Sequence, residues 1–91
     1  MPITHSLIIP VYRNEDSLPE LLQAVRGIAN EAGGTMEVVF VVDGSPDRCE
    51  EWLLGHLHDY AMPSQLIALS RNFGSFTAVR TGLAAARGEY I

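Results

Sequence analysis

The sequence predicts an α/β domain built on a parallel sheet with helices on both faces. Short apolar segments alternate with segments of helical periodicity three times along the chain. Connections of this kind between parallel strands are right-handed crossovers, which place helices against the sheet. The second apolar segment, from Met36 to Val42, is almost unbroken, as is typical of a parallel strand covered on both faces.

The first strand is predicted at Ser6 to Ile9 and is ended by Pro10. Ser17-Leu18-Pro19-Glu20 then has the pattern of a capping box, which marks the start of a helix. Gly33 and Gly34 end this helix. Its apolar positions follow helical spacing at Leu18, Leu21, Leu22, Val25, Ile28 and Ala29.

The second helix follows a second candidate capping box, Asp47-Arg48-Cys49-Glu50. After this box, apolar residues at helical spacing form one stripe, which consists of Cys49, Leu53, Leu57 and Tyr60. Trp52 and Leu54 flank the stripe.

The third strand is predicted at Gln65 to Ser70, and the third helix is ended by Gly88. We expect the buried face of that helix to consist of Phe76, Val79, Leu83 and Ala86. A fourth strand begins at Glu89-Tyr90-Ile91, so we expect residues 1–91 to form one incomplete domain.

Composition limits the class of protein. The chain has 91 residues, of which 47% are hydrophobic and 19% charged, as in a small globular domain. No apolar run approaches the roughly 20 residues that span a bilayer, and the N-terminus lacks the pattern of a signal peptide. We therefore expect a cytoplasmic location. Cys49 is the single cysteine, which excludes an internal disulfide and favours a small buried hydrophobe.

The charge excludes nucleic acid as a partner. The formal net charge is -5, from 11 acids against 6 bases. Every base is an arginine, and these arginines are scattered singly along the sequence. Binding a phosphate backbone requires a basic stripe.

Polar residues follow all three predicted strands, at the edge of a parallel sheet where ligands bind. Tyr12 can stack on a base. Asp43 can accept a hydrogen bond from a base N–H or a ribose hydroxyl, and Arg71 can donate to a base carbonyl or a phosphate. Together these residue types predict a nucleotide pocket.

Each of these residues also has an ordinary structural interpretation. Asp43 can start a turn or cap the next helix. Tyr12 can be a packing aromatic, Glu15 a solvated loop acid, and Arg71 a surface partner of a carboxylate. The three histidines follow no metal-ligand spacing, which favours surface positions over a metal site.

The common phosphate-binding loops are absent from the sequence. It contains neither G-x-G-x-x-G nor G-x-x-x-x-G-K-[ST], and it has no lysine. The carboxylates of Asp43 and Glu15 would repel a diphosphate unless a divalent cation stood between them.

Four segments resemble, in order and spacing, the start of glycosyltransferase family 2. They are residues 8–15 (IIPVYRNE), 41–47 (VVDGSPD), 70–74 (SRNFG) and 82–90 (GLAAARGEY), so the resemblance covers nearly the whole chain. The third segment is most similar to the branch that contains dolichol-phosphate mannosyltransferase and bacterial polyprenyl-phosphate sugar transferases.

The resemblance implies the N-terminal half of a GT-A fold, a Rossmann-like three-layer α/β/α arrangement that binds the nucleotide of a sugar-nucleotide donor. By the resemblance, Pro10 and Tyr12 line the base and Glu15 lies near the ribose. Asp43 holds the base, and Arg71 lies beside it. Two departures stand out: Arg13 is inserted where the family often passes from tyrosine to asparagine, and Val42 replaces a first aspartate.

The resemblance also implies parts beyond these residues. An Asp-x-Asp motif after the fourth strand would hold Mg²⁺ or Mn²⁺ on the diphosphate, and any membrane helices would lie downstream. The parent enzyme is expected to perform an inverting displacement with a polyprenyl phosphate or a cell-envelope glycan as acceptor. The 91 residues contain no catalytic or metal-binding residue by this reading, so we expect the chain alone to be inactive. The family's strand order leaves Ser6 to Ile9 as an edge, which favours self-association.

Two other classes remain open at this stage. One is a non-catalytic nucleotide-binding or interaction module. The other is a receiver-like signalling domain, which also places an aspartate at a strand end but requires a lysine that this chain lacks.

Overall fold

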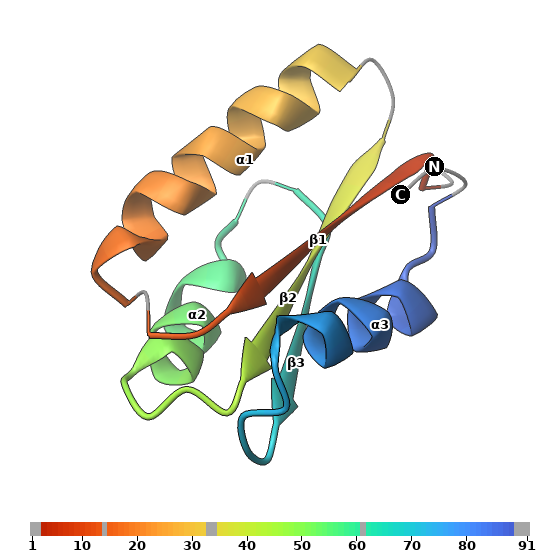
Figure 1. Ribbon diagram of the computed structural model, residues 1–91. Helices are drawn as coiled ribbons and strands as arrows, with labels where there is room; N and C mark the ends of the chain where they lie inside the picture. The colour runs from red at the N-terminus through yellow and green to blue at the C-terminus, as the bar shows by residue number, and fades with distance from the viewer. Residues whose placement is uncertain (1–2, 14, 33–34, 61, 89–91) are drawn as a thin grey trace.

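The computed structural model describes residues 3–13, 15–32, 35–60 and 62–88, which form an α/β fold (Figure 1). The strands are connected by α-helices, with one 3-10 turn (η1) after the first strand. The elements in chain order are β1 (His5–Val11), η1 (Glu15–Ser17), α1 (Leu18–Ala32), β2 (Met36–Asp43), α2 (Cys49–Leu57), β3 (Ser64–Leu69) and α3 (Ser75–Ala85).

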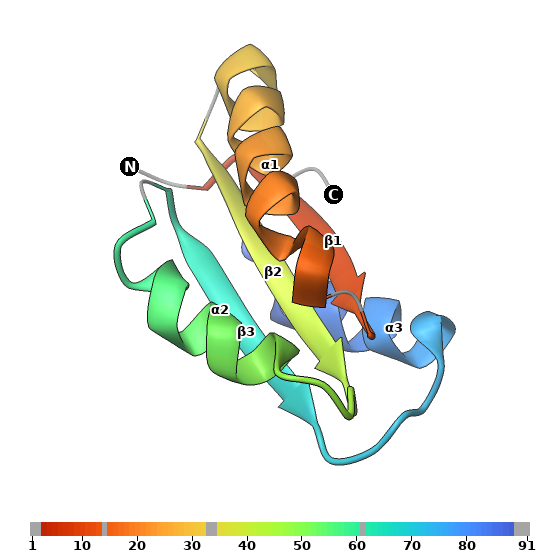
Figure 2. The same cartoon turned by 90° about the vertical axis from the view of Figure 1, so that its left-hand side faces the viewer.

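The three strands form one parallel sheet in the order β1-β2-β3. The register places Val42 opposite both Val11 of β1 and Ala68 of β3. Helices α1 and α2 lie against one face of the sheet and α3 against the other, as Figure 2 shows. This arrangement confirms the expected parallel sheet with helices on both faces.

The core is centred on β2, whose residues are all buried. Successive side chains of a strand point to opposite faces. Val38, Phe40 and Val42 therefore pack with α1 and α2, whereas Val39 and Val41 pack against Ala78 of α3. The unbroken apolar run seen in the sequence results from this burial on both faces.

Several boundaries differ from the expected ones: β1 begins at His5, β2 includes Asp43, and β3 lies at Ser64–Leu69. β1 continues through Pro10 to Val11, which is possible because an edge strand tolerates a residue without an N–H donor. α2 ends at Leu57, so Tyr60 is not part of the helical stripe. Its ring nevertheless packs on the core, and its hydroxyl donates to the Leu22 carbonyl at 2.5 Å.

The expected buried face of α3 is wrong. Phe76 is 77% exposed and Leu83 is 41% exposed. The buried residues of the helix are Ala78 and Gly82, and a Cβ at Gly82 would collide with the Ile8 side chain. The helix lies so close to the sheet that only small side chains fit beneath it.

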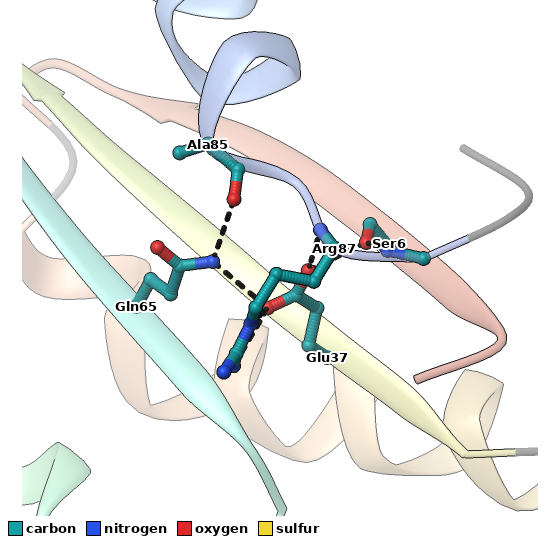
Figure 3. Close-up of polar contacts among 6 residues, drawn as sticks. Ser6, Glu37, Gln65, Ala85 and Arg87 are labelled. Carbon is teal, nitrogen blue, oxygen red and sulfur yellow. Dashed lines mark hydrogen bonds and ion pairs between the residues drawn. The ribbon is translucent and has the colours of Figure 1, made fainter. Parts of the chain in front are cut away.

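The buried carboxylate of Glu37, near the start of β2, binds the segment that follows α3. Glu37 is fully buried and accepts hydrogen bonds from the Ser6 hydroxyl at 2.6 Å and the Gln65 amide at 2.9 Å. Arg87 donates to it from its backbone N–H at 2.6 Å and from its guanidinium at 3.0 and 3.1 Å. Figure 3 shows these donors converging from β1, β3 and the segment after α3.

The pKa of Glu37 reflects this set of donors. Burial raises the pKa of the carboxyl group, but the hydrogen bonds from Ser6, Arg87 and Gln65 outweigh burial and lower it to about 2. Glu37 is therefore charged in the folded protein at neutral pH, and it anchors the segment after α3 at the end of β2 opposite to Asp43.

Two expectations fall outside the described residues. They are the helix end at Gly33 and Gly34 and the fourth strand at Glu89-Tyr90-Ile91. In the described part of the chain, the helices are all too short or too polar to cross a membrane.

Candidate functional site

The strand ends form one rim, as the parallel topology requires. β1, β2 and β3 end at Val11, Asp43 and Leu69, which lie at the same edge of the sheet. A pocket of about 380 Å³ opens there, lined by Pro10, Tyr12, Asp43, Asn72 and Ser75. Three of the expected site residues, Pro10, Tyr12 and Asp43, thus share one pocket. Asn72 and Ser75 were not assigned to the site from the sequence, although they follow the third strand.

Asp43 is buried, with 2% of its surface exposed. One carboxylate oxygen accepts the Phe73 N–H at 2.8 Å. The other accepts the Gly74 N–H at 3.0 Å and the Asn72 side-chain amide at 3.3 Å. Asp43 thus holds the loop before α3, rather than capping the next helix along the chain, and it also forms part of the pocket wall.

Gly44 brings the loop after β2 against the loop after β3. Its backbone has φ of 62°, a conformation that favours glycine. A Cβ at this position would collide with the backbone of Arg71 and Asn72. The residue 71–74 loop is thus held by this contact as well as by the hydrogen bonds to Asp43. The pocket wall beside Asp43 consists of two loops packed against each other.

Tyr12 is 41% exposed at the mouth of the pocket. The guanidinium of Arg13 lies over its ring, 5.3 Å from the ring centroid. Arg13 has φ of 55°, which is unusual for a residue with a side chain. An aromatic face next to a cation provides a surface on which a flat ring can stack.

Arg71 is not among the residues that line this pocket. Its guanidinium lies 4.6 Å from the centroid of the Phe73 ring. The structure thus brings Arg71 to the same rim as Tyr12 and Asp43 but directs its charge toward Phe73.

Glu15 lines a neighbouring hollow of about 430 Å³, which contains Arg13, Glu15, Asp16, Ser17, Glu20 and Asp47. Its carboxylate accepts the Arg48 N–H at 3.1 Å. Glu15 is therefore held by a contact between two loops and is not simply a solvated loop acid.

Asp47 makes contacts that the sequence pattern did not reveal. It accepts the Cys49 N–H at 3.3 Å, which agrees with a capping role, but the position before the helix is Arg48, so α2 begins one residue later than the capping box suggests. Asp47 also accepts the Glu15 N–H at 3.2 Å and a hydrogen bond from the Ser45 hydroxyl. Glu15 is 32 residues away in sequence, so local spacing gave no signal of this contact.

Among the described residues, no group of three or more His, Cys, Asp or Glu side chains is placed to hold a metal ion.

Residues 6–91 match the family described as glycosyl transferase family 2. Similar curated proteins include the undecaprenyl-phosphate 4-deoxy-4-formamido-L-arabinose transferases of Pseudomonas aeruginosa and Pectobacterium carotovorum, which are 37% and 34% identical over 86 residues. The match covers 94% of this chain and 25% and 26% of those proteins. The chain thus spans about a quarter of the length of the curated relatives it matches.

The fold is also similar to a solved structure. The crystal structure of S. aureus TarS 1-349 superposes with a TM-score of 0.76 and 23% sequence identity, covering 98% of this chain and 27% of that one. This likeness confirms the fold class that the sequence predicts, and the family match confirms the resemblance seen in the four segments. The chain belongs to glycosyltransferase family 2.

Proposed function

We propose that this chain is the nucleotide-binding part of a glycosyltransferase whose donor is a nucleotide-diphospho-sugar. The observation that carries the proposal is the pocket lined by Pro10, Tyr12 and Asp43 at the carboxyl ends of the parallel strands. In α/β sheets this edge is where ligands bind, and the chain belongs to a family of glycosyl transferases.

In this proposal Pro10 and Tyr12 line the base, and Tyr12 stacks on it. Asp43 accepts an N–H of the base. A carboxylate offers about four acceptor positions, and three N–H donors already reach Asp43, so a base N–H can be added without displacing the loop.

Glu15 and Arg71 complete the proposed set. Glu15 lies beside the base pocket, in the neighbouring hollow, and accepts a ribose hydroxyl. Arg71 would leave the Phe73 ring, over which it lies, to reach a base carbonyl. Such a movement costs only a surface cation–π contact of about 0.5–1 kcal/mol.

The proposed acceptor is a polyprenyl phosphate or a cell-envelope glycan. Support comes from the relatives, whose names specify undecaprenyl phosphate. A phosphate acceptor is already anionic, so its oxygen attacks the anomeric carbon without losing a proton, and the nucleoside diphosphate leaves with the electrons of the broken bond.

We further propose that a divalent ion, Mg²⁺ or Mn²⁺, supports the departing diphosphate when bound. Its ligands would belong to the longer parent protein, because no three His, Cys, Asp or Glu side chains among the described residues are grouped to hold a metal ion. The chain alone would then bind a nucleotide weakly and transfer no sugar. The parent would act at the cytoplasmic side of a membrane, where its lipid-phosphate acceptor is accessible.

Isothermal titration of UDP and GDP in the presence of Mn²⁺ tests the proposal. We expect the longer parent protein to bind one of them, and Tyr12→Ala to weaken that binding by about 5- to 150-fold, the equivalent of 1–3 kcal/mol of lost stacking. Leu54→Ala is the matched control, because Leu54 is 61% exposed on α2. If the parent gives no heat with either nucleotide, the proposal is wrong. Binding by a parent that transfers no sugar would instead favour a non-catalytic nucleotide-binding module.

A further inference from the structure

A hydrogen-bond network joins the loop after β1 to the loop after β2, directly beside the candidate pocket. We call it the Asp47 clamp, and its members are Arg13, Glu15, Ser45, Asp47 and Arg48. The Arg13 N–H donates to the Ser45 hydroxyl oxygen at 2.9 Å, and that hydroxyl donates to Asp47. The Glu15 N–H donates to Asp47 at 3.2 Å, and the Arg48 N–H donates back to Glu15 at 3.1 Å.

The clamp does more than cap a helix. Capping α2 needs a single acceptor for the Cys49 N–H, and serine or asparagine supplies one as well as aspartate does. Asp47 uses one oxygen for the Cys49 N–H and the Ser45 hydroxyl, and the other oxygen for the Glu15 N–H. Only a carboxylate accepts hydrogen bonds on both sides at once.

The clamp acts on the two residues that flank the pocket mouth. It holds Arg13 at φ of 55°, a conformation that costs energy for a residue with a side chain and persists where surrounding contacts enforce it. Arg13 directly follows Tyr12, and its guanidinium lies over the Tyr12 ring. Two residues further along the chain, the clamp holds both the N–H and the carboxylate of Glu15.

We propose that Asp47 is a positioning residue of the nucleotide pocket: it holds Tyr12 against the base and Glu15 against the ribose by fixing the loop between them. The inference rests on the proposed function. It gives a binding role to a residue whose sequence context indicates only a helix cap.

The charge state of Asp47 is suited to this role. Burial raises the pKa of its carboxyl group, but hydrogen bonds from Cys49, Ser45 and Glu15 outweigh burial and lower the pKa to about 2. The carboxylate therefore remains ionised at neutral pH and accepts hydrogen bonds from both loops.

The test uses two variants that keep the Cys49 cap. Asp47→Asn keeps the size and one acceptor but turns an N–H₂ group toward the Glu15 N–H, so that two donors face each other. Ser45→Ala removes the relay between Arg13 and Asp47 and leaves the acid in place. Glu51→Gln is the control, because it removes one negative charge from the first turn of α2, close in sequence to Asp47, and breaks an exposed ion pair with Arg48 at 3.8 Å.

We expect Asp47→Asn and Ser45→Ala to lose at least about tenfold in affinity for the nucleotide that the wild type binds, UDP or GDP, measured by calorimetry at a temperature where circular dichroism shows each variant folded. Glu51→Gln should bind like the wild type. Because Asp47 acts through Tyr12, the losses from Asp47→Asn and Tyr12→Ala should be less than additive in the double variant.

A second readout needs no ligand. Amide hydrogen exchange at Arg13 and Glu15 should be slow in the wild type and in Glu51→Gln, and fast in Asp47→Asn. Unchanged exchange at both amides, unchanged affinity in a folded Asp47→Asn variant, or fully additive losses would each overturn the positioning role. A wild-type parent that binds neither nucleotide contradicts the proposed function instead, and the exchange measurement still decides whether the clamp holds the loop.

Discussion

Two acids of β2 act as anchors at its opposite ends. Asp43 at the end of the strand holds the loop that leads into α3 through the Phe73 and Gly74 N–H groups. Glu37 near its start holds the segment that follows α3 through Arg87. Burying a carboxylate is costly unless donors satisfy it, and both acids are surrounded by donors. The same strand therefore fixes both ends of one helix.

The folded protein should lose stability as the pH falls because of Glu37. The pKa of Glu37 is about 2 in the folded chain against its usual 4.5, so the stabilisation, ~3 kcal/mol, is fully present above pH 4.5 and is lost as the pH approaches 2. Urea unfolding at a series of pH values between 5 and 2.5 measures it. Asp47 contributes in the same direction, so the comparison is with Glu37→Gln. In this variant the slope of the unfolding free energy against pH should be smaller. An identical slope in the variant would show that Glu37 is not the source.

Gly44→Ala should be strongly destabilising, by more than about 2 kcal/mol. The new methyl group would collide with the Arg71 backbone at a residue with φ of 62°. Gly27→Ala is the matched control, because Gly27 lies in α1 with nothing near its Cβ position. There alanine should be neutral or stabilise the fold by up to ~1 kcal/mol. Equal unfolding midpoints for the two variants in guanidinium chloride would contradict the close approach of the two loops.

At the scale of elements, α3 shows how packing distance selects side chains. The helix contacts the sheet through Ala78 and Gly82, while Phe76 and Leu83 face outward. Apolar periodicity alone cannot distinguish these two faces, because both contain residues of low polarity. The space between the helix and the sheet decides which face is buried. The Ile8 side chain occupies that space next to the Gly82 backbone.

Substitutions on the two faces of α3 should therefore differ in effect. Phe76→Ser should change the free energy of unfolding by no more than about 0.5 kcal/mol, since the side chain is 77% exposed. Ala78→Leu should cost about 1–3 kcal/mol or more, because the added volume has no room against Val39 and Val41. Thermal unfolding followed by circular dichroism compares them, and a larger loss from Phe76→Ser would mean that the helix packs on its other face.

At the scale of the whole molecule, the sheet has two edges. Within the described ranges β1 pairs only with β2, and β3 only with β2. Edge strands offer backbone groups for pairing with another chain unless charge, proline or a covering segment prevents it. β1 carries Pro10 near its end but no Asp, Glu, Lys or Arg. The part of the strand before Pro10 therefore has no charged residue or proline that would hinder pairing with another chain.

We propose that the 91-residue chain self-associates through the edge of β1. Light scattering of the isolated chain should give a mass above 10.0 kDa that rises with concentration, and β1 amides should become protected from exchange over the same range. A chain that stays monomeric at high concentration with well-ordered β1 amides would contradict this proposal.

The sequence predicted the parallel α/β fold because its signals were local and periodic. The apolar run of β2, the helical spacing of α1 and the glycines and prolines between elements each act over a few residues. It also predicted that Tyr12, Asp43 and Arg71 would meet, since the carboxyl ends of parallel strands lie at one edge. The structure places Tyr12 and Asp43 in one pocket together with Pro10, whereas Arg71 does not line that pocket.

Contacts over long sequence distances could not be predicted in this way. The donors of Glu37 come from positions 6, 65 and 87, and Asp47 reaches Glu15 across 32 residues.

The sequence by itself thus determined the order of the elements, the edge at which the site forms and the family of the chain. Only the tertiary structure decided which acids became anchors, which face of α3 touches the sheet and which side chains line the pocket. The physical reason is that periodicity specifies local conformation, whereas hydrogen-bond partners and packing distances depend on residues that approach one another only after the chain has folded.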